Sequence, residues 1–394
     1  MRRRTIVLLQ CATALGSMGY GTMFTILDDF RNDFGISESG LGVMVGVGFF
    51  TSFVAQIFIA PLADKGLAKK MVLFGLAVQI IGNLAMAFGH TFPVLLAGRL
   101  AMGLGSGVAG PAVRRIIILS DPLRMGSNLG RILSADVGGF ALGPVVSAAT
   151  AGSLGLGAPF ILISVAVMFV MFALSSLHVD EADRGSAPTQ KLAFDLLRVR
   201  PLAGAIIIGL SLFLMIGVFD SLWSVMMDDL GAPSWVMTIG ITIFVLPMIF
   251  LGPTGGRMTQ RIGPFRSTTI GLTLGSIFMA SYGMIPSPYL MPVIGVVHGI
   301  VDGLTITGGA SAIALVAPRE RLAAAQGLYG GLQTLTGGLT AIAAGAAYEQ
   351  WGRTPAYLSC SALMLLLIWG GAWLARDSYG LTVEDSRLAG QTTP

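Results

Sequence analysis

The sequence predicts an all-α integral membrane protein, because its composition, its apolar runs and an internal repeat all indicate membrane helices. The 394 residues are 54% hydrophobic and 11% charged, with a mean hydropathy of +0.79, whereas soluble domains carry about 25% charged residues. A spanning helix needs about 20 mostly apolar residues, and runs of this length recur along the whole chain. The 54 glycines suit close helix packing in lipid.

Twelve spans are expected, each an apolar run bounded by more polar residues. In chain order they cover residues 5–27, 39–63, 71–89, 92–113, 129–151, 158–177, 202–226, 235–255, 267–285, 289–317, 322–348 and 354–375. The first run follows three arginines, as a signal peptide would. Its 23 uncharged residues and the spans that follow favour a retained helix instead.

The basic residues predict the orientation. An even number of spans places both termini on one side, and 21 of the 24 Lys and Arg residues lie on that side. The exceptions are Arg31 and Arg353 on the other side and Arg99 inside the fourth span. This bias identifies the side with the termini as the cytoplasm. We therefore expect a multi-pass protein of the bacterial inner membrane with both termini cytoplasmic.

The polar segments divide the chain into two bundles of six helices. We expect an N-terminal bundle at 1–177, a cytoplasmic linker at 178–200, a C-terminal bundle at 201–376 and a cytoplasmic tail at 377–394. The linker is the one long polar interruption, with four basic and four acidic residues.

A loop sequence occurs in both halves at an offset of 196 residues. The matching pairs are Lys65 with Arg261, Lys70 with Arg266 and Gly75 with Gly271. Two similar bundles of membrane helices are typical of proteins that move solutes across a membrane.

These residues resemble the major facilitator superfamily of secondary transporters. The loop after the second span is similar to the family's Gly-x-x-x-Asp-Arg-x-Gly-Arg-Arg signature, with Asp64, Lys65, Lys69 and Lys70 in place. It departs from the signature at Ala60, Leu67 and Ala68. Asp64 can pair with a basic residue of the fifth span or with the positive N-terminus of a neighbouring helix. The resemblance implies a partner at the start of the fifth span, where Arg131 lies, and we expect this pair to help hold an outward-open state.

Two further motifs carry the resemblance. The fourth span contains Arg99 followed by glycines at 103, 105 and 107, similar to the family's second motif. The fifth contains Gly139, Gly143 and Pro144, similar to the motif of the twelve-helix drug–proton antiporters. Asp136 shares a face with the two glycines, which allow another helix to approach closely.

Charged residues inside the spans are the candidate proton-coupling groups. A charge at the bilayer centre costs about 2.5–3.5 kcal/mol on insertion scales, so Asp136 must be paired, protonated or exposed to water. Arg99, Arg114 and Arg115 are its possible partners. A structural ion pair is the alternative to a transport role.

The second half contains three ionisable residues in its spans. His298 and Asp302 lie four residues apart on the tenth span and therefore face the same side. Such a pair can hold or pass a proton, because histidine titrates near neutrality, or it can be a static hydrogen bond. Asp220 in the seventh span either faces the cavity or reaches the outer interface. Candidate substrate-cavity residues are Phe49, Phe53, Trp223, Phe244 and Met248, although core packing or lipid contact also explains each.

We interpret the chain as a secondary active transporter that exports small lipophilic compounds in exchange for protons. The alternatives are a lipid or metabolite facilitator without proton coupling, and a membrane sensor or scaffold. The sequence lacks a phosphate-binding loop, a Cys/His ligand cluster and a Gly-x-Ser-x-Gly motif. We therefore expect no enzyme activity, no cofactor and no metal. The expected partners are a small-molecule substrate, protons and the lipid bilayer, with no nucleic acid, and the expected state is a monomer.

Overall fold

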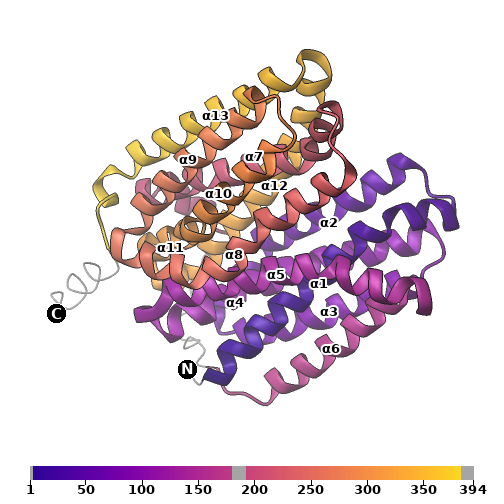
Figure 1. The fold of residues 1–394 in the computed structure, drawn as a ribbon. Coiled ribbons are helices and arrows are strands. Elements are labelled where there is room, and N and C mark those ends of the chain that lie inside the picture. The colour runs from indigo at the N-terminus through magenta and orange to yellow at the C-terminus, as the bar shows by residue number, and fades with distance from the viewer. Residues whose placement is uncertain (1–2, 180–191, 383–394) are drawn as a thin grey trace. The chain divides into compact units, whose positions relative to one another are not determined.

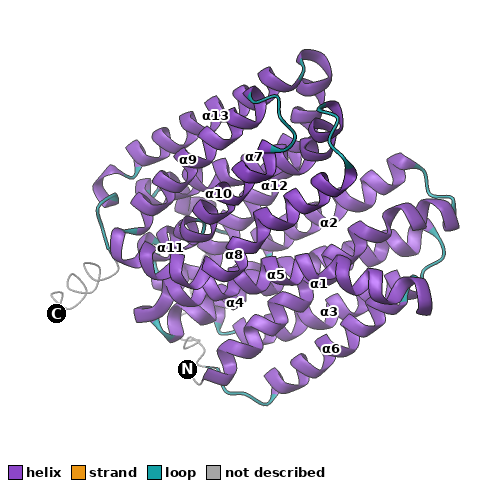
Figure 2. Cartoon of the chain, in the orientation of Figure 1, coloured by secondary structure: helices purple, strands orange, loops and turns teal. Residues whose placement is uncertain are grey.

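Helices dominate the computed structural model, which describes residues 3–179 and 192–382 (Figure 1). Figure 2 shows helices joined by short loops, and no strand occurs in this part of the chain. Much of the predicted linker and most of the predicted tail lie outside the described residues.

The α-helices overlap the predicted spans. The helices of the first half are α1 (Arg3–Phe34), α2 (Glu38–Phe58), α3 (Ala68–Phe88), α4 (Phe92–Ser120), α5 (Met125–Leu154) and α6 (Ala158–Ser175). Those of the second half are α7 (Arg200–Asp229), α8 (Ser234–Ile262), α9 (Pro264–Met284), α10 (Leu290–Thr305), α11 (Thr307–Val316), α12 (Leu322–Trp351) and α13 (Arg353–Leu374). Short 3₁₀ helices are η1 (Ala60–Lys65), η2 (Pro122–Arg124), η4 (Phe194–Arg198), η5 (Arg319–Arg321) and η6 (Arg376–Ser378).

The α-helices supply the twelve predicted spans, because α10 and α11 together form the tenth. The break falls at Ile306, where Thr305 bonds back to the carbonyl of Val301 at 2.7 Å within a glycine-containing stretch. By length and hydropathy alone, ten stretches among the described residues are apolar enough to cross a membrane. The other two spans are α9 and α12, whose many small or hydroxylated residues lower their hydropathy.

Several helices end away from their predicted boundaries. The second span was expected to continue to residue 63, but α2 ends at Phe58 and the chain enters η1. Pro61 lies in the first turn of η1, where a missing N–H is tolerated. Gly66 then ends η1 with φ 74°, a conformation that glycine adopts without strain. Asp64 lies in η1 two residues before this tight turn.

The described helices form two compact units. Unit 1 comprises Met1–Pro122, Ala135–Ala193 and Glu320–Gly331. Unit 2 comprises Leu123–Ser134, Phe194–Arg319 and Leu332–Pro394. The first turns of α5 therefore pack with the second half of the sequence, and the first turns of α12 pack with the first half.

Each unit has its own core. In unit 1, α4 packs on α2 and α3, and α6 packs on α1 and α3. In unit 2, α10 packs on α8, and α13 packs on α7 and α9. A buried cluster in unit 1 consists of Met23, Ile26, Phe30, Ile36, Met44, Met86, Leu95, Met102 and Phe160.

The repeat in the sequence is also a repeat in packing. In unit 1, a Cβ at Gly103 would lie 2.2 Å from the carbonyl oxygen of Gly48. In unit 2, a Cβ at Gly299 would lie 2.0 Å from the carbonyl oxygen of Phe244. Both members of the second pair follow the first by 196 residues. The two halves thus use equivalent glycines to bring equivalent helices into backbone contact.

Candidate transport site

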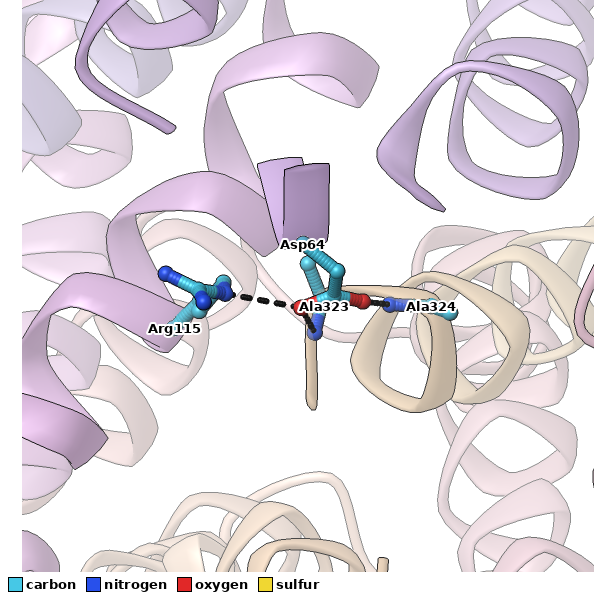
Figure 3. Close-up of polar contacts among 4 residues, drawn as sticks. All are labelled: Asp64, Arg115, Ala323 and Ala324. Carbon is cyan, nitrogen blue, oxygen red and sulfur yellow. Dashed lines mark hydrogen bonds and ion pairs between the residues drawn. The ribbon is translucent and has the colours of Figure 1, made fainter. Parts of the chain in front are cut away.

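The carboxylate of Asp64 connects η1 to the start of α12. Its Oδ1 accepts hydrogen bonds from Arg115 Nε at 2.7 Å and from the Ala323 amide at 2.9 Å. Its Oδ2 accepts from the Ala324 amide at 2.8 Å. Figure 3 shows Asp64 between the arginine on one side and the two amides on the other. The first amides of a helix have no partner within it, so this buried carboxylate caps α12 and neutralises Arg115.

This arrangement corrects the predicted partner of Asp64. The family resemblance implied Arg131, but Arg131 is exposed in unit 2 and its Nη1 lies 3.5 Å from Asn128 Oδ1. The sequence places four arginines from the end of the fourth span to the start of the fifth and contains no signal that ranks them. The amide donors come about 260 residues after Asp64. They match the alternative partner, a helix N-terminus, but local sequence does not indicate which helix supplies it.

The lysines of the same loop differ in their surroundings. Lys69 Nζ donates to the carbonyls of Ser175 at 2.8 Å and Leu177 at 2.5 Å, just after the end of α6. A cation at this position stabilises the helix C-terminus. Lys65 is half-buried and Lys70 is exposed.

Asp136 lies on α5 in unit 1 and has an exposed side chain. The hydroxyl of Ser17 on α1 donates a hydrogen bond to its Oδ1. Arg114, on α4, is the charged group that interacts with it electrostatically. The other two partners considered from the sequence lie elsewhere, because Arg115 binds Asp64 and Arg99 faces neutral groups. Ser17 was missed, since a serine in an apolar run has no distinguishing signal.

Arg99 is completely buried on α4. Its Nε donates to the carbonyl of Met44 at 3.2 Å, and its guanidinium lies 3.9 Å from the centre of the Tyr20 ring. No carboxylate lies within ion-pair distance of Arg99 among the described residues. A carbonyl and an aromatic face therefore stabilise this buried cation.

The glycine motif of α5 brings this helix into contact with α1. A Cβ at Gly139 would lie 2.0 Å from the carbonyl oxygen of Ala14, and one at Gly143 would lie 2.5 Å from the amide of Thr22. Pro144 lies within α5 one residue later. This seam holds α1 close to α5, next to the Ser17–Asp136 hydrogen bond.

In unit 2, His298 and Asp302 face each other on α10. Their Nε2 and Oδ2 atoms are 3.5 Å apart, and the residues are 0% and 3% exposed. On the other side of the ring, the Tyr282 hydroxyl lies 3.2 Å from His298 Nδ1. The three groups form a buried line of polar atoms. Tyr282 was missed because it comes from α9, whereas the His–Asp spacing is local.

Aromatic rings enclose His298. Phe278 stacks on it at a centroid distance of 4.8 Å, and Phe244 approaches at 5.2 Å. The ring centroid of Phe219 lies 5.0 Å from those of both Phe244 and Trp223. These rings surround the buried His298 side chain.

The predicted cavity residues differ in their surroundings. Trp223 and Met248 are buried in the core of unit 2, and the Trp223 indole donates to the carbonyl of Met237 at 3.2 Å. Phe244 is half-buried within the aromatic cluster. Phe49 and Phe53 are half-buried in unit 1, where Phe49 packs edge-on against Tyr20 at 5.5 Å. Trp223 and Met248 thus pack as core residues, the alternative left open above, because neighbouring helices cover them.

Asp220 lies on α7 with an exposed side chain and no hydrogen-bond partner among the described residues. The next residue, Ser221, lines a cavity of about 650 Å³ between α7 and α12. Asp229 and Glu349 also line this cavity, and Tyr348 donates to Asp229 Oδ2 at 2.6 Å. Within the described residues, no group of His, Cys, Asp and Glu side chains could hold a metal ion.

The sequence and the fold of this chain are similar to those of known proteins. Residues 9–223 and 205–393 match the family described as the Major Facilitator Superfamily. The chain belongs to this superfamily. It is therefore a multi-pass membrane transporter and not an enzyme, with the twelve-helix fold of that family.

Curated relatives of this superfamily transporter include drug-resistance proteins. It is 30% identical over 129 residues to the quinolone resistance protein NorA of Staphylococcus aureus, a match covering 32% of this chain and 33% of NorA. The chain thus spans about a third of the length of this relative. It is 25% identical over 277 residues to the multidrug resistance protein MdtG of Serratia proteamaculans, covering 66% of each chain.

Solved structures show the same fold at low identity. The human organic anion transporter MFSD10 has a TM-score of 0.76 at 16% identity, covering 95% of this chain and 99% of that one. The transporter FucP has a TM-score of 0.75 at 14% identity, covering 94% of this chain and 98% of its own.

Proposed function

We propose that this superfamily transporter exports small lipophilic compounds in exchange for protons, by alternating access across a bacterial inner membrane. Both termini lie in the cytoplasm, and the transporter acts as a monomer. The names of NorA and MdtG, a quinolone resistance protein and a multidrug resistance protein, support this class of cargo.

The observation that carries the proposal is a contrast between carboxylates. Asp64 is held by an arginine and two amides and is a structural charge. Asp136, Asp220 and Asp302 lie on spanning helices, and none is within 4.0 Å of a Lys or Arg nitrogen among the described residues. A carboxylate without a fixed cation in a membrane helix is costly as an anion. Such groups are suited to gaining and losing a proton.

The three carboxylates have different access. Asp136 and Asp220 are exposed, whereas Asp302 is enclosed with His298 and Tyr282. Alternating access requires a proton site that is open in one state and closed in another. In this proposal Asp302 and His298 hold the proton while Asp220 and Asp136 exchange it with water.

The contact of Asp64 with α12 is the proposed cytoplasmic gate. It fixes the first turn of α12 to η1 and α4 while the transporter is closed on this side. Proton movement supplies the energy to break it, since one charge crossing 100 mV releases about 2.3 kcal/mol.

Dye transport into inside-out membrane vesicles tests the proposal. An acid interior should drive accumulation of a lipophilic dye, and an ionophore that collapses the gradient should abolish it. The triple variant Asp136→Asn, Asp220→Asn and Asp302→Asn should insert normally and lose the pH-driven flux.

The same experiment separates the alternatives. Dye movement that ignores the gradient would indicate a facilitator, and absence of movement for every dye and metabolite tried would indicate a sensor or scaffold. Undiminished pH-driven flux in the triple variant would refute the assignment of these carboxylates.

A further inference from the structure

Two consecutive arginines at the end of α4 face the first turns of α12. Arg115 reaches α12 through Asp64, which it shares with the amides of Ala323 and Ala324. Arg114 lies beside α12 directly, because a Cβ at Gly330 would be 3.2 Å from its Nη1. The same guanidinium interacts electrostatically with Tyr329. Arg115 therefore binds the carboxylate that caps α12, and Arg114 lies against the third turn of α12.

The start of α12 packs tightly over this region. A Cβ at Gly327 would lie 2.4 Å from the carbonyl oxygen of Gln56 and 2.6 Å from the Cβ of Ala60. A Cβ at Gly331 would lie 3.0 Å from Ile57 Cδ1. All of these residues belong to unit 1. This close contact between α12 and α2 excludes water from one side of Arg114.

The positive charge of Arg114 is poorly compensated by the groups around it. Its Nη1 is buried and makes no hydrogen bond to the described residues. The carboxylate of Asp64 is already bound to Arg115 and to the α12 amides. Asp136 on α5 is the anion that interacts with Arg114.

Two groups of the described residues act on Asp136. Ser17 donates to it from α1, and Arg114 acts on it from α4. Tyr329 of α12 acts on Arg114 from the other side. The charge of Asp136 is therefore felt chiefly by the arginine that lies beneath α12.

We propose that the charge of Asp136 controls the docking of α12 on α2 through Arg114. With Asp136 negative, Arg114 is compensated and α12 stays docked. When Asp136 is neutral, Arg114 is a cation without a counter-charge beside the water-free contact between α12 and α2. This state is strongly unfavourable. The start of α12 is then released. Arg114 is a positioning residue that links a proton site to the gate, so this inference deepens the proposed function and rests on it.

Distances between spin labels measure docking without measuring transport. Labels are placed at Lys70→Cys on α3 and Glu320→Cys before α12, both exposed, after replacing Cys11 and Cys360 with serine. In nanodiscs, Asp136→Asn should shift the distance distribution toward a released, longer population. We expect the ratio of released to docked protein to rise about tenfold, which corresponds to about 1.4 kcal/mol.

A second substitution provides the decisive comparison. Asp136→Asn combined with Arg114→Gln should return the distribution to the docked one, because no uncompensated cation remains. The matched control combines Asp136→Asn with Arg131→Gln, which also removes a positive charge but not the one beside Gly330, and it should stay released. An unshifted Asp136→Asn distribution, or equal rescue by the two arginine variants, would overturn the proposal.

The single variant Arg114→Gln keeps the test decisive if Asp136→Asn fails to fold. Acidification should lengthen the distances in the wild type and leave those of Arg114→Gln unchanged, and an equal response in both would reject the linkage. Loss of pH-driven dye flux with normal docking behaviour would instead count against the proposed function alone.

Discussion

Arg115 donates its Nε to Asp64 Oδ1 at 2.7 Å, and the same carboxylate accepts the first amides of α12. The pair is buried, with side chains 2% and 0% exposed. One carboxylate thus satisfies an arginine and a helix terminus together, so its loss would leave three donors in unit 1 without a partner.

We predict that Asp64→Asn will reduce transport strongly while membrane insertion remains normal. The substitution leaves the Arg115 cation buried without a counter-charge, and breaking such a pair costs about 3–5 kcal/mol. The measurements are dye flux in vesicles and the amount of protein in the membrane. Lys70→Gln, an exposed change in the same loop, is the control and should retain flux. A wild-type rate in Asp64→Asn would show that the gate does not depend on this carboxylate.

Tyr282→Phe should lower proton-driven flux while preserving the fold. The ring keeps its packing in the aromatic cluster, but the hydrogen bond to His298 Nδ1 is lost. A net loss of about 1 kcal/mol corresponds to a flux decrease of about fivefold. Substrate counterflow at equal pH, which moves no net protons, should stay unchanged. Equal loss of both activities would indicate a packing role for the hydroxyl.

Asp220→Asn should leave thermal stability unchanged and still impair proton-driven flux. Its side chain is exposed and has no hydrogen-bond partner among the described residues, so the folded state loses no interaction. Surface substitutions of this kind change stability by about 0.5 kcal/mol or less. Melting in detergent and dye flux would be measured on the same preparation. If flux were retained, Asp220 would be only an interfacial residue.

Gly139→Ala should destabilise the protein, whereas Gly152→Ala on the same helix should not. The new methyl group at 139 would lie 2.0 Å from the carbonyl oxygen of Ala14, but none of the described atoms lies within 4 Å of one at 152. Overpacking of this kind costs about 1–3 kcal/mol, while alanine in an open helical position is favoured over glycine by about 0.5–1 kcal/mol. Thermal melting of the two variants checks the contrast. Similar melting temperatures would mean that α1 and α5 can separate freely.

The sequence was sufficient for the features that depend on local order. Hydropathy located the spans because lipid requires each helix to satisfy its own backbone, whereas the orientation that the basic loops indicate stays a prediction. The His298–Asp302 contact was predictable because residues four apart on a helix share a face. The loop repeat at an offset of 196 also predicted two related halves, which the Gly103–Gly48 and Gly299–Phe244 contacts confirm.

Only the tertiary structure decided which distant residues meet. Asp64 binds Arg115 and not the predicted Arg131. Asp136 accepts a hydrogen bond from Ser17 and interacts with Arg114, and His298 contacts the hydroxyl of Tyr282. It also placed the first turns of α5 and α12 in the unit of the opposite half. These outcomes depend on helix packing and register, which side-chain shape and backbone approach at glycines determine between residues 16 to 260 positions apart. A periodic pattern along one helix contains no information about its neighbour, so the sequence alone could identify the charges but not their partners.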